Sequence, residues 1–139
     1  MLINTKFLGT IEIDSQTIIN FNGGLPGFQQ LHKFVLLPVE ENQSLYYLQC
    51  VEEESICFVV MSPFFIKDDY EIDISEETVE MLEIDNSEDV SLFVILTIPE
   101  DINNMTANLL APIVINTVNK RAVQEILNND KYNIKHKLF

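Results

Sequence analysis

The sequence predicts a mainly β fold, a small antiparallel barrel-like or roll domain with one or two short helices. Short runs rich in Ile, Val, Phe, Tyr and Thr recur between turn signals along most of the chain. Two runs, residues 56–61 and 92–96, are apolar throughout, which is typical of strands covered on both faces. A doubly covered strand in so short a chain favours a closed or partly closed barrel with a cover.

Ten strands are expected, and two of them show clear alternation. In residues 10–14, Ile11 and Ile13 share one face, and residues 70–74 alternate in the same way. The expected strands span residues 2–7, 10–14, 17–21, 34–38, 45–51, 56–62, 70–74, 90–98, 112–117 and 123–127.

The best helix candidate is Glu76–Leu82. Ser75 is suited to the N-cap, and two glutamates occupy the first turn, where the helix dipole favours negative charge. A second short helix is expected to begin near Met105, with Asn103 or Asn104 as its cap and Pro112 as its stop.

The densest turn signal lies at residues 23–28, which hold three of the four glycines. Pro26 and Gly27 suit a type II turn, because proline fixes φ and glycine supplies a positive φ. We expect a structural corner anchored by Phe28. A phosphate-binding loop is disfavoured, because no lysine and no clear helix follow.

The chain is expected to form a single domain, residues 1–139, with a loosely held tail at about 128–139. No internal repeat or linker is evident. The first residues do not resemble a signal peptide, and no apolar run is long enough to cross a bilayer. We therefore expect a cytoplasmic protein.

Charge narrows the classes of partner. Eight basic residues against 22 acidic ones give a net charge of −14, so direct binding to nucleic acid or to an anionic membrane is not expected. Residues 1–104 hold 20 acids and three bases, net −17, whereas residues 105–139 hold two acids and five bases, net +3. The acidic body serves solubility or steers a basic partner.

No enzyme is predicted. The sequence lacks GxSxG, HExxH, G-x4-GK[ST] and GxGxxG patterns, and it has only two histidines. Cys50 and Cys57 have a spacing that does not fit zinc, so they are expected to be reduced thiols. We predict no catalytic, cofactor-binding or metal-ligating residues, and no cofactor.

Residues 105–116 carry no charge, which is unusual in so acidic a chain. Burial in the core is one explanation, with Thr106 and Asn108 hydrogen-bonding the turn backbone. The other explanation is a partly exposed apolar edge that recognises a partner.

This stretch, together with Ile19-Asn20-Phe21-Asn22-Gly23-Gly24-Leu25-Pro26-Gly27-Phe28, resembles the FliW flagellar assembly factor family, and weaker matches run from end to end. The resemblance implies a small β module without enzymatic activity. It also implies alternate binding, in the cytoplasm, of flagellin and of CsrA, a dimeric RNA-binding regulator of flagellin translation. FliW-like proteins antagonise CsrA allosterically, and flagellin occupancy releases CsrA to repress translation, so that translation is coupled to export.

Two groups of partner-binding residues are predicted, although each has a structural alternative. For an acidic contact, solvated surface is the alternative. For an apolar contact, the tyrosines have the alternative of simply covering the core. The acidic group is Asp68, Asp69, Glu71 and Asp73, and the apolar group is Tyr46, Tyr47, Phe64, Phe65, Met105, Thr106 and Asn108.

Two other functions stay open at this stage. A closed β-barrel can bind a small molecule, although a core this rich in aliphatic residues predicts a filled interior. An acidic mimic of nucleic acid can occupy a basic protein, but its carboxylates should be evenly spaced, whereas those of residues 52–54 are contiguous.

Overall fold

The computed structural model describes residues 1–139 and contains eleven strands, one α-helix and four 3₁₀ helices. The strands are β1 (Leu2–Asn4), β2 (Thr10–Glu12), β3 (Ile19–Phe21), β4 (Lys33–Pro38), β5 (Leu45–Cys50), β6 (Cys57–Met61), β7 (Val90–Thr97), β8 (Thr106–Ala107), β9 (Ile113–Asn116), β10 (Arg121–Gln124) and β11 (His136–Lys137). The helices are η1 (Ser15–Thr17), η2 (Pro63–Phe65), α1 (Glu76–Leu82), η3 (Ser87–Asp89) and η4 (Ile102–Asn104).

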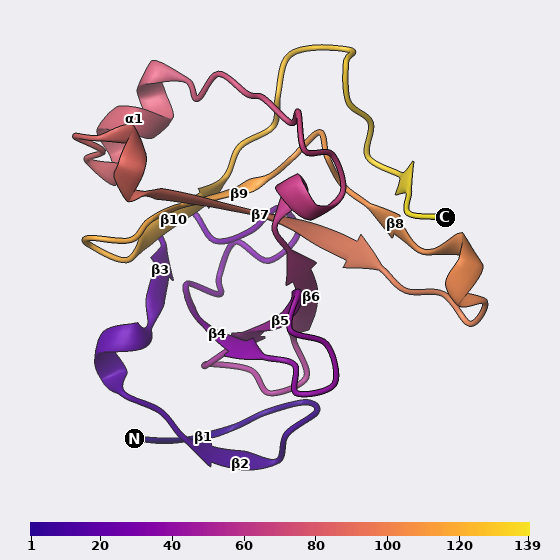
Figure 1. The fold of residues 1–139 in the computed structure, drawn as a ribbon. Helices are drawn as coiled ribbons and strands as arrows, with labels where there is room; N and C mark the ends of the chain where they lie inside the picture. The colour runs from indigo at the N-terminus through magenta and orange to yellow at the C-terminus, as the bar shows by residue number, and fades with distance from the viewer.

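Seven strands close into a barrel in the order β7-β6-β5-β4-β3-β10-β9, and β9 returns to β7 (Figure 1). Closure is possible because β7 is long: its first half pairs with β9, and its second half pairs with β6 and β8. All neighbouring strands in the barrel are antiparallel except β3 and β10, where Asn20 lies beside Arg121. The predicted mainly β, barrel-like fold is confirmed.

Alternating side chains of the barrel strands enter two different cores. In β6, Phe58 and Val60 pack inside the barrel, whereas Val59 and Met61 pack outside against a second cluster. Strand β7 follows the same alternation, so the prediction that these strands are covered on both faces is confirmed. The buried interior consists of Ile19, Phe21, Leu25, Phe34, Leu48, Cys50, Val60, Ile113, Ile115 and Ala122.

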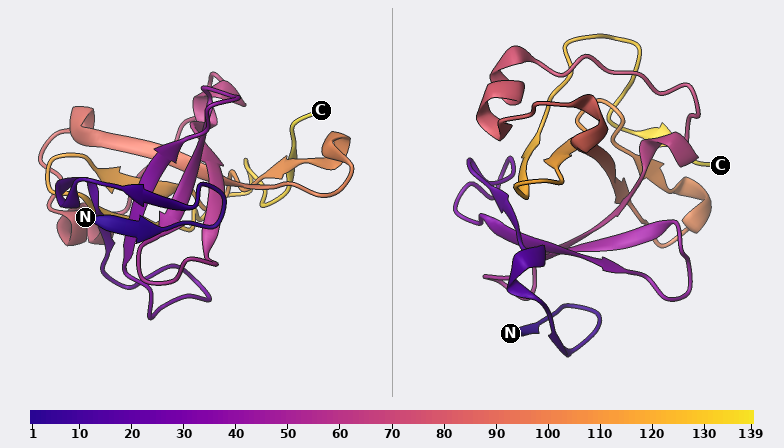
Figure 2. Two further views of the ribbon diagram at one scale, coloured as in Figure 1. Left: turned by 90° about the horizontal axis from the view of Figure 1, so that it is seen from below. Right: turned by 60° about the vertical axis from the view of Figure 1, so that its left-hand side comes forward.

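Two covers protect the outside of the barrel. The β1–β2 hairpin brings Ile3 onto the outer residues Val35 and Leu37 of β4, and it lies across the barrel in the left view of Figure 2. The second cover lies over β6 and β7 and includes Tyr70 and Tyr132. Each cover supplies the apolar contact that the outward side chains need.

The helix Glu76–Leu82 forms as predicted, with the Ser75 hydroxyl accepting from the Thr78 backbone N–H. The predicted turn is also present: Gly27 has φ 85°, and Phe28 packs half-buried against the barrel interior. No helix in the chain is long and apolar enough to span a membrane.

The predicted strand at residues 70–74 is wrong, because no other strand pairs with this segment. The alternation is real, since Tyr70 is buried, Ile72 and Ile74 are half-buried and the residues between them are exposed. The alternation therefore reflects a segment with one buried face that does not pair with another strand.

The predicted helix near Met105 is wrong as well. A single 3₁₀ turn, η4, is capped by Asp101 rather than by Asn103 or Asn104. The chain then enters β8, where Thr106 and Ala107 pair with the end of β7. Long-range pairing outweighs local helix propensity here.

The segment 128–139, expected to be loosely held, is attached at several points. Tyr132 is 5% exposed, the Asn133 carbonyl accepts from Leu109 N–H, and β11 pairs with β8. The β7–β8 connection and the C-terminus extend together from one side of the barrel (Figure 2, left).

Candidate functional site

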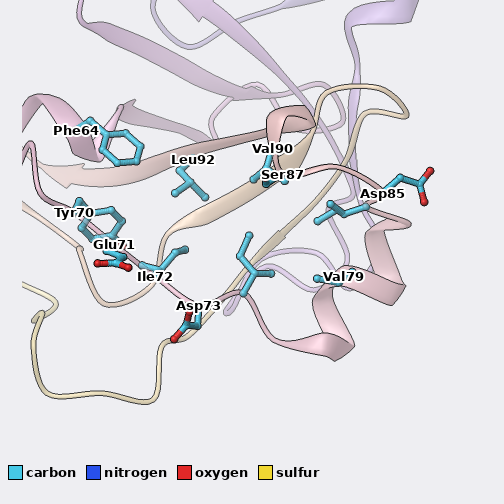
Figure 3. A pocket seen from close by; sticks show the side chains of 12 residues that line it. Phe64, Tyr70, Glu71, Ile72, Asp73, Val79, Asp85, Ser87, Val90 and Leu92 are labelled. Atoms are coloured by element: carbon cyan, nitrogen blue, oxygen red, sulfur yellow. The ribbon is translucent and has the colours of Figure 1, made fainter.

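The largest surface depression is a groove of about 620 Å³ between residues 70–74, α1 and the start of β7 (Figure 3). Phe64 and Tyr70 lie at one end, and Asp85 lies at the other. The apolar lining consists of Ile72, Ile74, Val79, Ile84, Val90 and Leu92. The groove therefore offers contact area to apolar side chains from a partner.

The polar part of the groove is acidic. Its carboxylates belong to Glu71, Asp73 and Asp85, and no lysine, arginine or histidine lines it. None of the three carboxylates forms an ion pair within the protein, whose side-chain salt bridges are Lys67–Asp69 and Arg121–Glu83. Positive charge on a partner would thus find uncompensated negative charge here.

Two tyrosines anchor the segment that borders the groove. The Tyr70 hydroxyl donates to the Leu109 carbonyl at 2.7 Å, and its ring packs on Tyr132 with centroids 4.6 Å apart. The Tyr132 hydroxyl in turn accepts from the Glu71 N–H at 2.8 Å. Burial, together with the neighbouring Tyr132, raises the pKa of Tyr70 above its ordinary value. Tyr70 is therefore a neutral donor that fixes the segment.

A second depression of about 420 Å³ lies on the other side of the same segment. It is more polar and is lined by Glu71, Ile72 and Asp73 together with Leu127, Asn128, Asn129 and Lys131. Residues 71–73 therefore form a ridge between two depressions, one apolar and one polar.

The structure brings part of the predicted site together. Phe64, Glu71 and Asp73 all line the groove. Phe65, which is 71% exposed, lies beside Phe64 in η2. Asp68 and Asp69 are exposed on the approach to Tyr70, where Asp69 pairs with Lys67 at 3.7 Å.

The two tyrosines of β5 lie elsewhere, on opposite faces of the strand as alternation requires. Tyr46 packs toward the barrel interior in an edge contact with Phe93, and Tyr47 stacks on Phe7 with centroids 5.1 Å apart. Both are half-buried. Their contacts are those of side chains that cover the core.

The uncharged stretch 105–116 is mostly buried, which confirms the burial interpretation. Met105 packs on the second cover, and Thr106 is half-buried in β8. The hydrogen bond predicted from the Thr106 side chain to the turn backbone does not form, because Thr106 lies in a paired strand. The Asn108 carboxamide accepts from Ala111 N–H at 3.1 Å, as expected for a turn residue. These three residues do not line the groove.

Sequence reasoning missed several residues of the groove and its support. Val79 lies in the predicted helix Glu76–Leu82, but Ile84 and Val90 follow that helix, and nothing in their spacing indicates that they share a surface with Ile72. Tyr132 lies in the segment predicted to be loosely held, although it is that segment's only tyrosine and an aromatic residue is a signal for burial. No group of three or more His, Cys, Asp or Glu side chains is arranged to hold a metal ion.

Comparison with known proteins identifies the kind of chain that carries this groove. A family model described as FliW protein matches residues 2–138. The chain belongs to the FliW family. A protein named flagellar assembly factor FliW from Clostridium botulinum strain 657 is 42% identical over 139 residues, covering 100% of this chain and 97% of the relative. The protein of the same name from Bacillus subtilis strain 168 is 43% identical over 136 residues, covering 98% of this chain and 95% of the relative.

The fold of the FliW family is also seen directly. A crystal structure of the flagellar assembly factor FliW superposes with a TM-score of 0.94 at 42% identity, covering 100% of this chain and 97% of that one. The resemblance inferred from residues 19–28 and 105–116 is confirmed. Residues 19–28 form the corner beside the barrel interior, and residues 105–116 form the buried β8–β9 region. The resemblance therefore rests largely on residues that build the core of this chain.

Proposed function

We propose that this FliW-family chain is a non-enzymatic, cytoplasmic flagellar assembly factor that binds flagellin and CsrA alternately and thereby couples flagellin translation to export. The names of its relatives support a role in flagellar assembly. The groove carries the proposal within the molecule, because it combines an apolar lining with three unpaired carboxylates. Such a surface binds protein segments rather than performing chemistry.

Charge supports the CsrA part of the proposal. A protein that binds RNA carries many basic residues, so the field of an acidic surface steers it toward this chain from a distance, whichever of its faces makes the contact. Once this chain is bound, its net charge of −14 repels RNA phosphates without covering the RNA site. This is a physical route to allosteric antagonism. The apolar lining and the exposed Phe64 and Phe65 suit the flagellin segment.

The test is a three-component binding experiment with this protein, its cognate CsrA and its cognate flagellin, followed by calorimetry and size-exclusion chromatography. We expect a stable complex with CsrA that flagellin dissolves. Glu71→Lys should weaken CsrA binding about tenfold or more, whereas Glu54→Lys, an equal charge change at an exposed residue outside the groove, should change it little. No binding to either partner at micromolar concentrations would overturn the proposal.

The structure does not favour a small molecule bound inside the barrel. Ten buried side chains fill the barrel interior, including Phe21 and Phe34, which are 0% exposed. The depression at the barrel end lined by Ile19 and Phe93 measures about 230 Å³, below the ~300–1,000 Å³ of typical ligand sites.

A further inference from the structure

Residues 71–74 carry backbone groups that the protein itself does not use. The N–H groups of Ile72, Asp73 and Ile74 form no hydrogen bond within the chain, and neither do the carbonyls of Glu71 to Ile74. Closure of the barrel pairs β7 with β9, so the barrel itself has no free edge, whereas β1, β2 and β11 outside it each keep one. Residues 71–74, which include the ridge, thus offer backbone N–H donors and carbonyl acceptors that have no partner within the protein.

The bonds at its two ends show which way these groups point. Glu71 N–H donates to the Tyr132 hydroxyl, and Ser75 N–H donates to the Glu125 carboxylate, so both point toward the chain that follows β10. In extended backbone, successive residues direct their N–H and C=O groups to opposite edges. The groups of Ile72 and Ile74 therefore face the apolar groove, and those of Asp73 face the polar depression.

We propose that a partner segment binds by adding as a β-strand along the groove edge of residues 71–74, pairing with the backbone of Ile72 and Ile74. The inference rests on the proposed function and deepens it by naming the recognition mode and the chemistry of the partner. Main-chain hydrogen bonds supply affinity in strand addition, and alternate side chains supply specificity.

The side chains around the edge define the occupant as an extended segment in which basic residues alternate with apolar ones. The added strand places one set of side chains over the groove lining beside Ile72 and Ile74. Its other set lies next to Glu71 and Asp73, which are exposed and unpaired, so positive charge is favoured there. The groove of about 620 Å³ has room for the apolar set.

Amide hydrogen exchange on the full chain, followed by NMR, tests the proposal. The probe is a blocked six-residue peptide that alternates Lys and Val, and its control is a peptide of the same composition with three Lys followed by three Val. At saturation with the alternating peptide, exchange at Ile72 and Ile74 should slow about tenfold or more, while Asp73 exchanges as before. The block peptide should leave all three unchanged.

Unchanged exchange at Ile72 and Ile74 with millimolar alternating peptide would overturn the proposal, as would equal protection by the two peptides. Asp73→Lys should weaken binding of the alternating peptide about tenfold, whereas Glu100→Lys, an equal charge change at another exposed acid, should alter it less than about twofold. An equal loss of peptide affinity in both variants would indicate that the peptide is attracted by the overall negative charge of the protein. That result would contradict binding at the edge of residues 71–74.

The same exchange measurement separates this inference from the proposed function. If cognate flagellin or CsrA binds and neither protects Ile72 and Ile74, strand addition fails while the proposed function stands. If the alternating peptide protects both amides but neither cognate protein binds, the edge is real and the flagellar partners are wrong.

Discussion

Gly24 lies where the chain from β3 turns back on itself. Its φ is +67°, and a Cβ built on it would lie 2.6 Å from both Gln29 Cα and the Phe28 carbonyl oxygen. Those atoms are backbone and cannot rotate away. The positive φ predicted for Gly27 is confirmed. The need for glycine at position 24 could not be predicted, because it arises from the close approach of the backbone of residues 28 and 29 and not from a turn pattern.

We expect Gly24→Ala to destabilise the protein by about 2 kcal/mol or more, because the substitution combines backbone strain with a clash. Gly23→Ala is the matched control, since a Cβ there meets nothing within 4 Å and its φ is not positive. Urea denaturation at neutral pH measures both. Equal stability of the two variants would show that residues 28 and 29 can move.

Tyr70 links stability to alkaline pH. Its folded-state pKa is raised above 10.0, so the folded chain keeps a proton that the unfolded chain releases. Its stabilising contribution is therefore complete below about pH 10 and is lost as the pH rises further. Burial also raises the pKa of Cys57 to about 11, and that contribution is lost in the same direction above pH 9.0.

Tyr70→Phe should cost about 1–3 kcal/mol at pH 7, because the buried Leu109 carbonyl loses its donor. Between about pH 9 and 11, the variant should lose less additional stability than the parent, since only the contributions of Cys50 and Cys57, whose pKa values burial raises, remain. Denaturation curves at several pH values test this expectation. Parallel pH profiles would contradict the assigned role of Tyr70.

Elements whose signal is local could be predicted from the sequence. Helix α1 appears with the predicted bounds and cap, because Ser75 and the acidic first turn act within a few residues. Predicted strand 123–127 forms instead as Arg121–Gln124, because its register is set by pairing with β9 and β3. The groove could be predicted only in part, since the tertiary fold and not sequence spacing brings Ile72 and Val90 to the same groove.

The end of α1 depends on an amide from another element. Asn116, which is 3% exposed in β9, donates through Nδ2 to the Leu82 carbonyl at 2.9 Å and accepts from Val118 N–H. Glu83 there adopts a left-handed φ of 54°. The last carbonyls of α1 are thus satisfied by the barrel.

Asn116→Ala should destabilise the protein by about 1–2 kcal/mol and should speed amide exchange in the last turn of α1. The Glu83 carbonyl and the Val118 N–H lose their partner, and the Leu82 carbonyl keeps only the Asn119 Nδ2 donor at 2.9 Å. Asn103→Ala is a suitable control, since Asn103 is exposed and its side chain forms no hydrogen bond. Equal amide exchange in α1 in the two variants would show that Asn116 does not stabilise the C-terminal end of the helix.

The whole molecule carries 22 acidic side chains on a chain with only three side-chain or terminal ion pairs. Such a surface repels itself, and salt relieves the repulsion. The acidic groove rim contributes to this strain, which a basic partner would relieve.

We expect the melting temperature at pH 7 to rise by several degrees between about 0.01 M and about 0.3 M NaCl, because screening favours the compact state. Near pH 4.2, where the net charge approaches zero, the dependence on salt should vanish. Scanning calorimetry at both pH values provides the comparison. A melting temperature that falls with salt at pH 7 would indicate that attractive pairs dominate the surface.

Closure of the barrel joins distant parts of the chain, because Asn20 and Phe21 of β3 lie beside Arg121 and Ala122 of β10. During synthesis, β3 leaves the ribosome long before its neighbour β10 exists. The nascent chain can form the β4–β5–β6 meander early, but its aromatic interior stays open until residue 124 has emerged from the exit tunnel. The protein therefore closes its barrel only after residue 124 has been synthesised, and a ribosome stalled upstream of that point would present an open apolar sheet to chaperones.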